Sequence, residues 1–83
     1  MGSITLFPNP NNGEMTLNYV IGEKEIGELR ILDIAGRLIE KYELQNTKNT
    51  LAIKQLSLQS GVYLYQILVN DKITKSDRLI ILK

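Results

Sequence analysis

Residues 61–83 read GVYLYQILVNDKITKSDRLIILK, and this stretch decides the class of fold. Aliphatic and aromatic residues fill 62–69 apart from Gln66, Asn70-Asp71 follows, and 72–82 ends in the apolar run Leu79-Ile80-Ile81-Leu82. Runs of this composition are typical of β-strands, and asparagine and aspartate both tolerate the left-handed backbone of a two-residue turn. The stretch therefore predicts two long antiparallel strands joined by a tight hairpin.

Shorter alternating runs precede this hairpin, separated by glycine, asparagine and aspartate. In 14–20, Met15, Leu17 and Tyr19 fall on one face while Thr16 and Asn18 take the other. Short, evenly spaced runs favour a sandwich or barrel over a helical fold. We expect an all-β chain, a small Ig-like antiparallel β-sandwich of about seven strands, over residues 4–7, 14–20, 28–34, 37–44, 50–54, 62–69 and 72–82.

The connections also carry recognisable turn residues. In Asp33-Ile34-Ala35-Gly36-Arg37, aspartate suits the first position of a type I turn and Gly36 supplies a positive φ, which predicts a bulged hairpin. In the connection 56–61 we expect Leu56 and Leu58 to close one end of the sandwich. Pro8 and Pro10 fix φ and disfavour helical backbone at the residues before them, which predicts a stiff, extended segment.

Composition excludes most site chemistry. The 83 residues contain no cysteine, histidine or tryptophan, so disulfides, thiolate metal sites, the commonest general base and the strongest stacking platform are all missing. The formal net charge is +1, with both signs mixed along the chain, which argues against a nucleic-acid or anionic-membrane partner. We expect no enzyme activity, no cofactor, no metal and no small-molecule substrate.

The remaining candidates for chemistry are weak. Glu40 and Glu43 stand three apart on an expected strand and so point to opposite faces, and Glu23 lies beside Lys24 in a loop. Solvated charge accounts for both sets. The segment 9–13 offers carbonyl oxygens but only one adjacent carboxylate, which is too little charge for a tight calcium site.

The ends and faces of the chain add two expectations. Residues 1–3 have the character of a start codon and cloning scar, which leaves 4–83 as one domain cut from a longer polypeptide. The run 62–69 is apolar on both faces, although a sandwich normally leaves one face of each sheet to solvent. Either a loop or a partner is expected to cover its outer face.

The order of these features resembles the type A C-terminal sorting domain of the Bacteroidetes type IX secretion system. The order runs Leu6-Phe7-Pro8-Asn9-Pro10 with Gly13, then Asp33-Ile34-Ala35-Gly36-Arg37, then Leu56 before Gly61-Val62-Tyr63, and then a terminal strand ending in lysine. Each motif is unspecific alone, but the ordered set covers residues 4–83. The lysine spacing departs from the family's final motif, because Ser76, Asp77 and Arg78 follow Lys75.

The resemblance implies a C-terminal secretion signal. It would be read by outer-membrane proteins of the secretion machinery, carry a fused cargo through the periplasm and outer membrane to the cell surface or beyond, and then be removed by a sortase. The residues implied in recognition are Pro8, Asn9, Pro10, Gly13, Asp33, Gly36, Gly61, Tyr63, Lys75, Leu79, Ile80, Ile81, Leu82 and Lys83. We expect the machinery to engage the edge or outer face of the terminal hairpin, and the isolated domain to dimerise or exchange strands.

An alternative function is a spacer or adhesive accessory module of immunoglobulin or fibronectin III character on a surface protein, including one that binds carbohydrate. A sugar platform needs exposed aromatic rings. The aromatic residues stand mostly at positions expected to face inward: Phe7, Tyr19, Tyr42, Tyr63 and Tyr65.

Overall fold

The computed structural model describes residues 4–46 and 48–83, and the expected scar at 1–3 lies outside them. Within these ranges the chain forms seven strands and no helix, and so no helix long and apolar enough to span a membrane. The strands are β1 (Thr5–Phe7), β2 (Glu14–Asn18), β3 (Gly27–Leu32), β4 (Leu38–Leu44), β5 (Thr50–Lys54), β6 (Gly61–Val69) and β7 (Lys72–Ile81).

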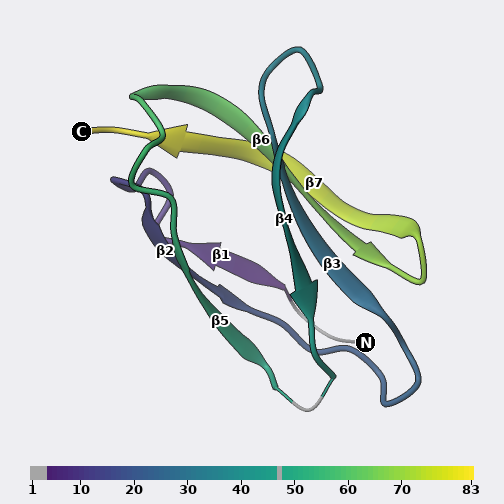
Figure 1. The fold of residues 1–83 in the computed structure, drawn as a ribbon. Helices are drawn as coiled ribbons and strands as arrows, with labels where there is room; N and C mark the ends of the chain where they lie inside the picture. The colour runs from purple at the N-terminus through teal and green to yellow at the C-terminus, as the bar shows by residue number, and fades with distance from the viewer. Residues whose placement is uncertain (1–3, 47) are drawn as a thin grey trace.

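The strands form two antiparallel sheets that face one another (Figure 1). One has three strands in the order β1-β2-β5, and the other has four in the order β4-β3-β6-β7. All pairings between neighbouring strands are antiparallel. The expected small all-β sandwich is therefore confirmed, and no predicted strand end differs from the observed one by more than two residues.

The core lies between the sheets and comes from the inward positions of both. On β2, Met15 and Leu17 are buried, and Tyr19 just beyond the strand continues the same face, as the alternation predicted. Burial of apolar surface contributes roughly 25 cal/mol per Å² and is the main stabilising term in a domain of this kind. The largest fully buried side chains are Leu17, Leu29, Ile31, Ile53, Ile67, Leu79 and Ile81.

Both predicted hairpins are confirmed. Asn70 and Asp71 have φ values of 52° and 65°, the left-handed pair that a two-residue turn with the twist of the strands requires. Between β3 and β4, the Gly36 amide donates to the Asp33 carbonyl at 3.0 Å, and Gly36 has a φ of 89°. The pairing of these two strands shifts register between Ile31 and Leu32, as a bulged hairpin does.

Two local predictions were wrong. Leu58 is 7% exposed and joins the core, but Leu56 is 62% exposed, because a turn closed by the Leu58 amide and the Gln55 carbonyl leaves Leu56 outside the sandwich. The segment around Pro8 and Pro10 bends rather than running extended. Its contacts, described below, turn it back along the edge of β7.

Candidate recognition site at the terminal strand

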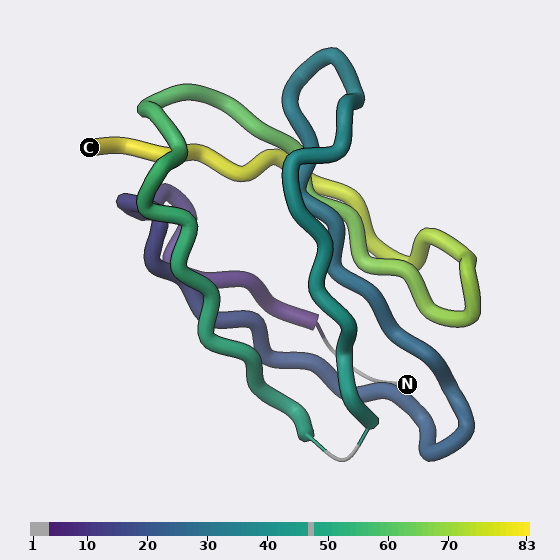
Figure 2. Tube along the Cα trace, viewed as in Figure 1, coloured from purple at the N-terminus to yellow at the C-terminus, as the bar shows by residue number. Residues whose placement is uncertain are grey.

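The terminal strand β7 lies at one edge of the larger sheet. It pairs with β6 on one side, and in the part of the chain that the structure describes no strand lies on the other. Figure 2 shows the turn after β1 beside the end of β7, at the left of the view. We call residues 8–11 of this turn the arm. Because an edge strand presents a row of unpaired main-chain groups, the arm decides which groups of β7 remain free.

The side chain of Asn9 bonds the main chain of β7 at two points. Its Nδ2 donates to the Arg78 carbonyl at 2.8 Å, and its Oδ1 accepts from the Ile80 amide at 3.0 Å. A side-chain amide carries the same donor and acceptor as a peptide unit. Pro8 and Pro10 have no amide hydrogen, so the Asn9 side chain supplies a donor that its two neighbours lack.

Asn11 extends the contact through its main chain. Its amide donates to the Ile80 carbonyl at 3.0 Å, and its carbonyl accepts from the Leu82 amide at 2.7 Å. Its own side chain is buried and holds the turn together. Nδ2 donates to the Pro8 carbonyl at 2.9 Å, and Oδ1 accepts from the Gly13 amide at 2.8 Å. Asn11 therefore both shapes the arm and attaches it to β7.

Gly13 anchors the arm to the smaller sheet. Its φ is 106°, and a Cβ at this position would lie 2.6 Å from the Gln55 carbonyl oxygen. The Gly13 carbonyl accepts from the Gln55 amide at 2.7 Å. Both the left-handed backbone and the close approach require glycine here.

The predicted glycine–any–tyrosine motif lies directly against the terminal strand. Gly61 is opposite Ile81 and Tyr63 is opposite Leu79 in the β6–β7 pairing. The Tyr63 hydroxyl donates to the Gln59 carbonyl at 2.8 Å, which supplies the rim partner expected for it. Gly61 has no positive φ, and a Cβ there would meet only the Tyr63 ring at an ordinary 3.9 Å. The fold therefore does not require glycine at 61.

Two lysines attach the terminal strand to other parts of the chain, Lys75 from within β7 and Lys83 from just beyond it. The Lys75 ammonium donates to the Ile4 carbonyl at 3.0 Å, which joins the middle of β7 to the start of the smaller sheet. The Lys83 amide donates to the Ser60 hydroxyl at 2.9 Å, and its ammonium donates to the Leu56 carbonyl. The strand is thus held on its arm side, its inner face and its end.

Asp33 and Gly36 do not join this region, because their hairpin connects β3 to β4 at the opposite edge of the sheet. The Asp33 carboxylate is used within the turn, where it accepts from the Ala35 and Arg37 amides at 3.0 and 2.8 Å. The bond from the Arg37 amide, with its guanidinium nearby, holds the pKa of Asp33 below its ordinary value. These contacts support a role in closing the hairpin.

The outer face of β6 and β7 is covered only in part. Leu68 is buried, whereas Val62 is 48% exposed and Leu82 is 60% exposed. Val62 lies opposite Ile80, so these side chains form a small apolar patch near the end of β7. The inward side chains of β7, Leu79 and Ile81, are fully buried.

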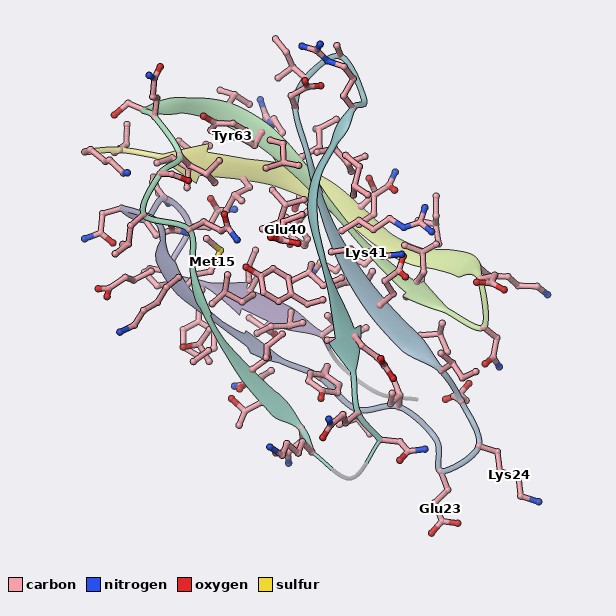
Figure 3. All side chains as sticks on the ribbon, in the orientation of Figure 1. Met15, Glu23, Lys24, Glu40, Lys41 and Tyr63 are labelled. Carbon is pink, nitrogen blue, oxygen red and sulfur yellow. The ribbon has the colours of Figure 1, made fainter. Side chains whose placement is uncertain are left out.

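The charged residues weighed as candidates for chemistry lie elsewhere. Figure 3 shows Glu23 and Lys24 projecting from the sandwich at the end opposite Met15 and Tyr63. Glu40 is opposite Ile31 and Glu43 is opposite Glu28, so the two carboxylates fall on different faces of β4, as predicted. In residues 4–46 and 48–83, no three acidic side chains gather as a metal site would require.

Sequence reasoning did not select Asn11, Ser60 or Asp77. The Asp77 carboxylate accepts from the Arg78 amide at 2.8 Å, so it occupies another edge group of β7. The signal for Asn11 is its place between a proline and an Asn-Gly pair, where an asparagine side chain commonly bonds the amide two residues on. Asp77 and Ser60 have no comparable local signal.

Fold and site together define a small β-sandwich module whose terminal strand is bonded to segments from near its beginning and from before β6. The chain belongs to the family of secretion system C-terminal sorting domains, whose family model matches residues 5–82. It is thus a type IX sorting domain, of a family that is not an enzyme family, and it acts with the secretion machinery in export to the cell surface or extracellular space. A comparison with curated proteins found no match.

Proposed function

We propose that this chain is the signal by which the type IX machinery carries a fused cargo across the outer membrane, and that a sortase then removes it. The supporting observation is the convergence of three separate motifs on β7. The arm bonds its edge, the segment 61–63 pairs with its last residues, and Lys75 and Lys83 tie it to the body.

The recognition residues fall into sets according to whether their side chains are already bonded within the domain or remain available to a partner. Both polar groups of the Asn9 side chain bond β7, and Gly13 acts through its backbone, so we propose that Pro8, Asn9, Pro10 and Gly13 do not bind the machinery themselves but form the arm that covers the edge of β7 beforehand. Gly61 and Tyr63 support it from β6, and Asp33 and Gly36 keep the opposite hairpin closed. We propose that Ile80, Leu82 and Lys83 meet the machinery, while Lys75, Leu79 and Ile81 hold the strand in place.

A fusion experiment tests this function. Residues 4–83 are joined to a fluorescent cargo that carries a periplasmic export signal, in a bacterium with a type IX system. The intact fusion is expected on the cell surface or in the medium, and a fusion lacking 79–83 is expected to remain in the periplasm with its cargo fluorescent. Normal export of the truncated fusion would contradict the proposal.

Truncation also removes two fully buried side chains, so a milder pair separates recognition from folding. Leu82→Ser changes a side chain that is 60% exposed at the end of β7, and Ile26→Ser changes one that is 72% exposed in the connection between β2 and β3. Both are expected to fold, and only Leu82→Ser is expected to reduce export.

Isolated copies are expected to pair by exchanging segments. The arm already occupies part of the β7 edge, so two closed copies cannot join there edge to edge. Exchange of the terminal strand would rebuild the same contacts between chains. Sedimentation equilibrium at high protein concentration should show a dimer, and a monomer throughout would contradict the exchange.

The accessory-module alternative lacks a supporting feature in the residues that the structure describes. Tyr19 and Tyr65 are buried and Tyr42 and Tyr63 are partly buried, which leaves Phe7 as the one exposed ring among these positions. A single ring does not make a sugar platform.

A further inference from the structure

The arm imitates a neighbouring strand. In a parallel pair, one residue donates to the residue before its partner and accepts from the residue after it. The main chain of Asn11 does this around Ile81. The side-chain amide of Asn9 does the same around Leu79, two residues earlier on β7. The arm therefore occupies the place of a parallel strand at the edge of the sheet.

This imitation covers only the last part of the edge. The main-chain groups of Arg78 and Ile80 point away from β6, since they bond the arm, and alternation along the strand directs those of Ser76 the same way. Ser76 is exposed, and no described residue supplies a hydrogen bond to its main chain on that side. Within residues 4–46 and 48–83, the edge thus continues beyond the arm with a donor and an acceptor that no other described residue bonds.

The arm is also a replaceable occupant. Both bonds from the Asn9 side chain are exposed to solvent, and exposed contacts of this kind open at low free-energy cost. A true extended segment lying along residues 76–82 would repeat the four bonds of the arm and add those of Ser76. It would also lie beside the patch formed by Val62, Ile80 and Leu82.

Resting on the proposed function, we propose that the outward edge of β7 from Ser76 to Leu82 is a strand-acceptor site. Its ligand is an extended segment of a secretion-machinery protein, running parallel to β7 and recognised through its main chain. The arm is the internal occupant that this segment displaces. Partners that add a strand to an exposed edge gain affinity from main-chain bonds in this way.

Ser76→Pro, with Ser76→Ala as its matched control, tests the acceptor edge in the cargo fusion. Proline is tolerated on an edge strand where its missing amide hydrogen faces outward, so the β6 pairing and the arm remain intact. Export of Ser76→Pro is expected to fall about fivefold, the loss that one hydrogen bond produces. Ser76→Ala keeps the main-chain donor and is expected to export normally.

Asn9→Ala tests the displaced occupant, with Asn12→Ala as its control, because Asn12 accepts only a local bond from the Glu14 amide. Hydrogen exchange at the Ile80 amide is expected to rise about tenfold in Asn9→Ala and to stay unchanged in Asn12→Ala. Export of the Asn9→Ala fusion is expected to equal or exceed that of the unsubstituted fusion, because the edge is easier to open.

The outcomes separate the two proposals. Normal export of a folded Ser76→Pro fusion would overturn the acceptor site. Loss of export in Asn9→Ala, with the Ile80 amide open to hydrogen exchange, would also overturn it. In either case, export of the intact fusion leaves the proposed function standing. If Asn9→Ala self-associates and loses export, the edge of β7 binds a second copy of the chain, and the proposed site for a machinery segment is again overturned. An intact fusion that remains in the periplasm refutes the proposed function itself.

Discussion

The Lys75 ammonium bonds the Ile4 carbonyl at 3.0 Å, across 71 positions of sequence. This bond joins β7 of the larger sheet to Ile4, which immediately precedes β1 of the smaller sheet. The ammonium is partly buried, so its bond is shielded from water more than a surface contact would be.

Replacing Lys75 with methionine keeps most of the side-chain packing and removes the charged donor. We expect the free energy of unfolding to fall by about 1.5 kcal/mol, the lower end of the range for a hydrogen bond with a charged donor, because this bond is only partly buried. Lys72→Met, an exposed lysine at the start of the same strand, is the control and should leave stability unchanged. Urea denaturation of both variants provides the measurement, and equal midpoints would refute the prediction.

Substitution by alanine should affect stability differently at two glycines with different surroundings. Gly13→Ala combines a left-handed backbone with a 2.6 Å approach to the Gln55 carbonyl, and we expect a loss of about 2 kcal/mol. Gly61→Ala would make only an ordinary contact with the Tyr63 ring and should be neutral or stabilising by up to about 0.5 kcal/mol. Similar losses in both variants, measured by thermal and urea unfolding, would be inconsistent with the structure.

The two leucines of the β5–β6 connection should also differ in how much stability is lost when each is replaced by alanine. Leu58→Ala removes a side chain packed against the core and should cost about 2 to 3 kcal/mol. Leu56→Ala changes a side chain outside the sandwich and should stay within about 0.5 kcal/mol of the parent. The midpoint of urea unfolding measures each, and a large loss in Leu56→Ala would restore the original expectation that both leucines close the sandwich.

The carboxylate in the Asp33 turn predicts that folding stability depends on pH in the acid range. Its folded-state pKa lies below the ordinary 3.8, so the ionised carboxylate stabilises the fold above that pH, and the contribution disappears as pH falls through the folded-state pKa. Asp33→Asn should therefore be less stable than the parent at neutral pH, and the difference should shrink below about pH 3.8. A difference that stays constant from pH 7 to pH 2.5 would exclude this role.

Tyr65 predicts a dependence on base. Burial, and then the negative charge of Asp77 opposite it on β7, raises the pKa of its hydroxyl above the ordinary 10.0. The neutral phenol is favoured by the fold, so its contribution is complete below pH 10 and declines as pH rises through the folded-state pKa. Tyr65→Phe should reduce the loss of stability above pH 10, measured by far-UV circular dichroism. A parallel loss in both proteins would contradict this assignment.

Period-two patterns and turn residues were sufficient to predict the strands and both hairpins, because these features depend on neighbours in sequence. The alternation in 14–20 identified Met15, Leu17 and Tyr19 as inward, and all three are buried. The position of Leu56 was not predictable in the same way. Leu56 and Leu58 are equally apolar and spaced like strand residues, and only the turn between Gln55 and Leu58 separates their environments.

Of the residues that gather at β7, the sequence predicted some and missed Asn11, Ser60 and Asp77, and it did not predict their arrangement. Motif order selected Asn9 and the terminal strand, yet local pattern contains no sign that a side-chain amide substitutes for a strand. The two hydrogen bonds of this contact join residues that are 69 and 71 positions apart in the sequence. The prediction of an extended segment at Pro8 and Pro10 was wrong for the same reason, because bonds to distant residues determine where the arm bends.

The attachment of the arm to β7 also sets the order in which the domain can be completed. During synthesis, residues 8–11 emerge long before the residues 78–82 that bond them. Long-range pairings of this kind form slowly, because a large loop must close before any bond is gained. Until its final strand arrives, the arm therefore lacks the partners that fix it against the larger sheet.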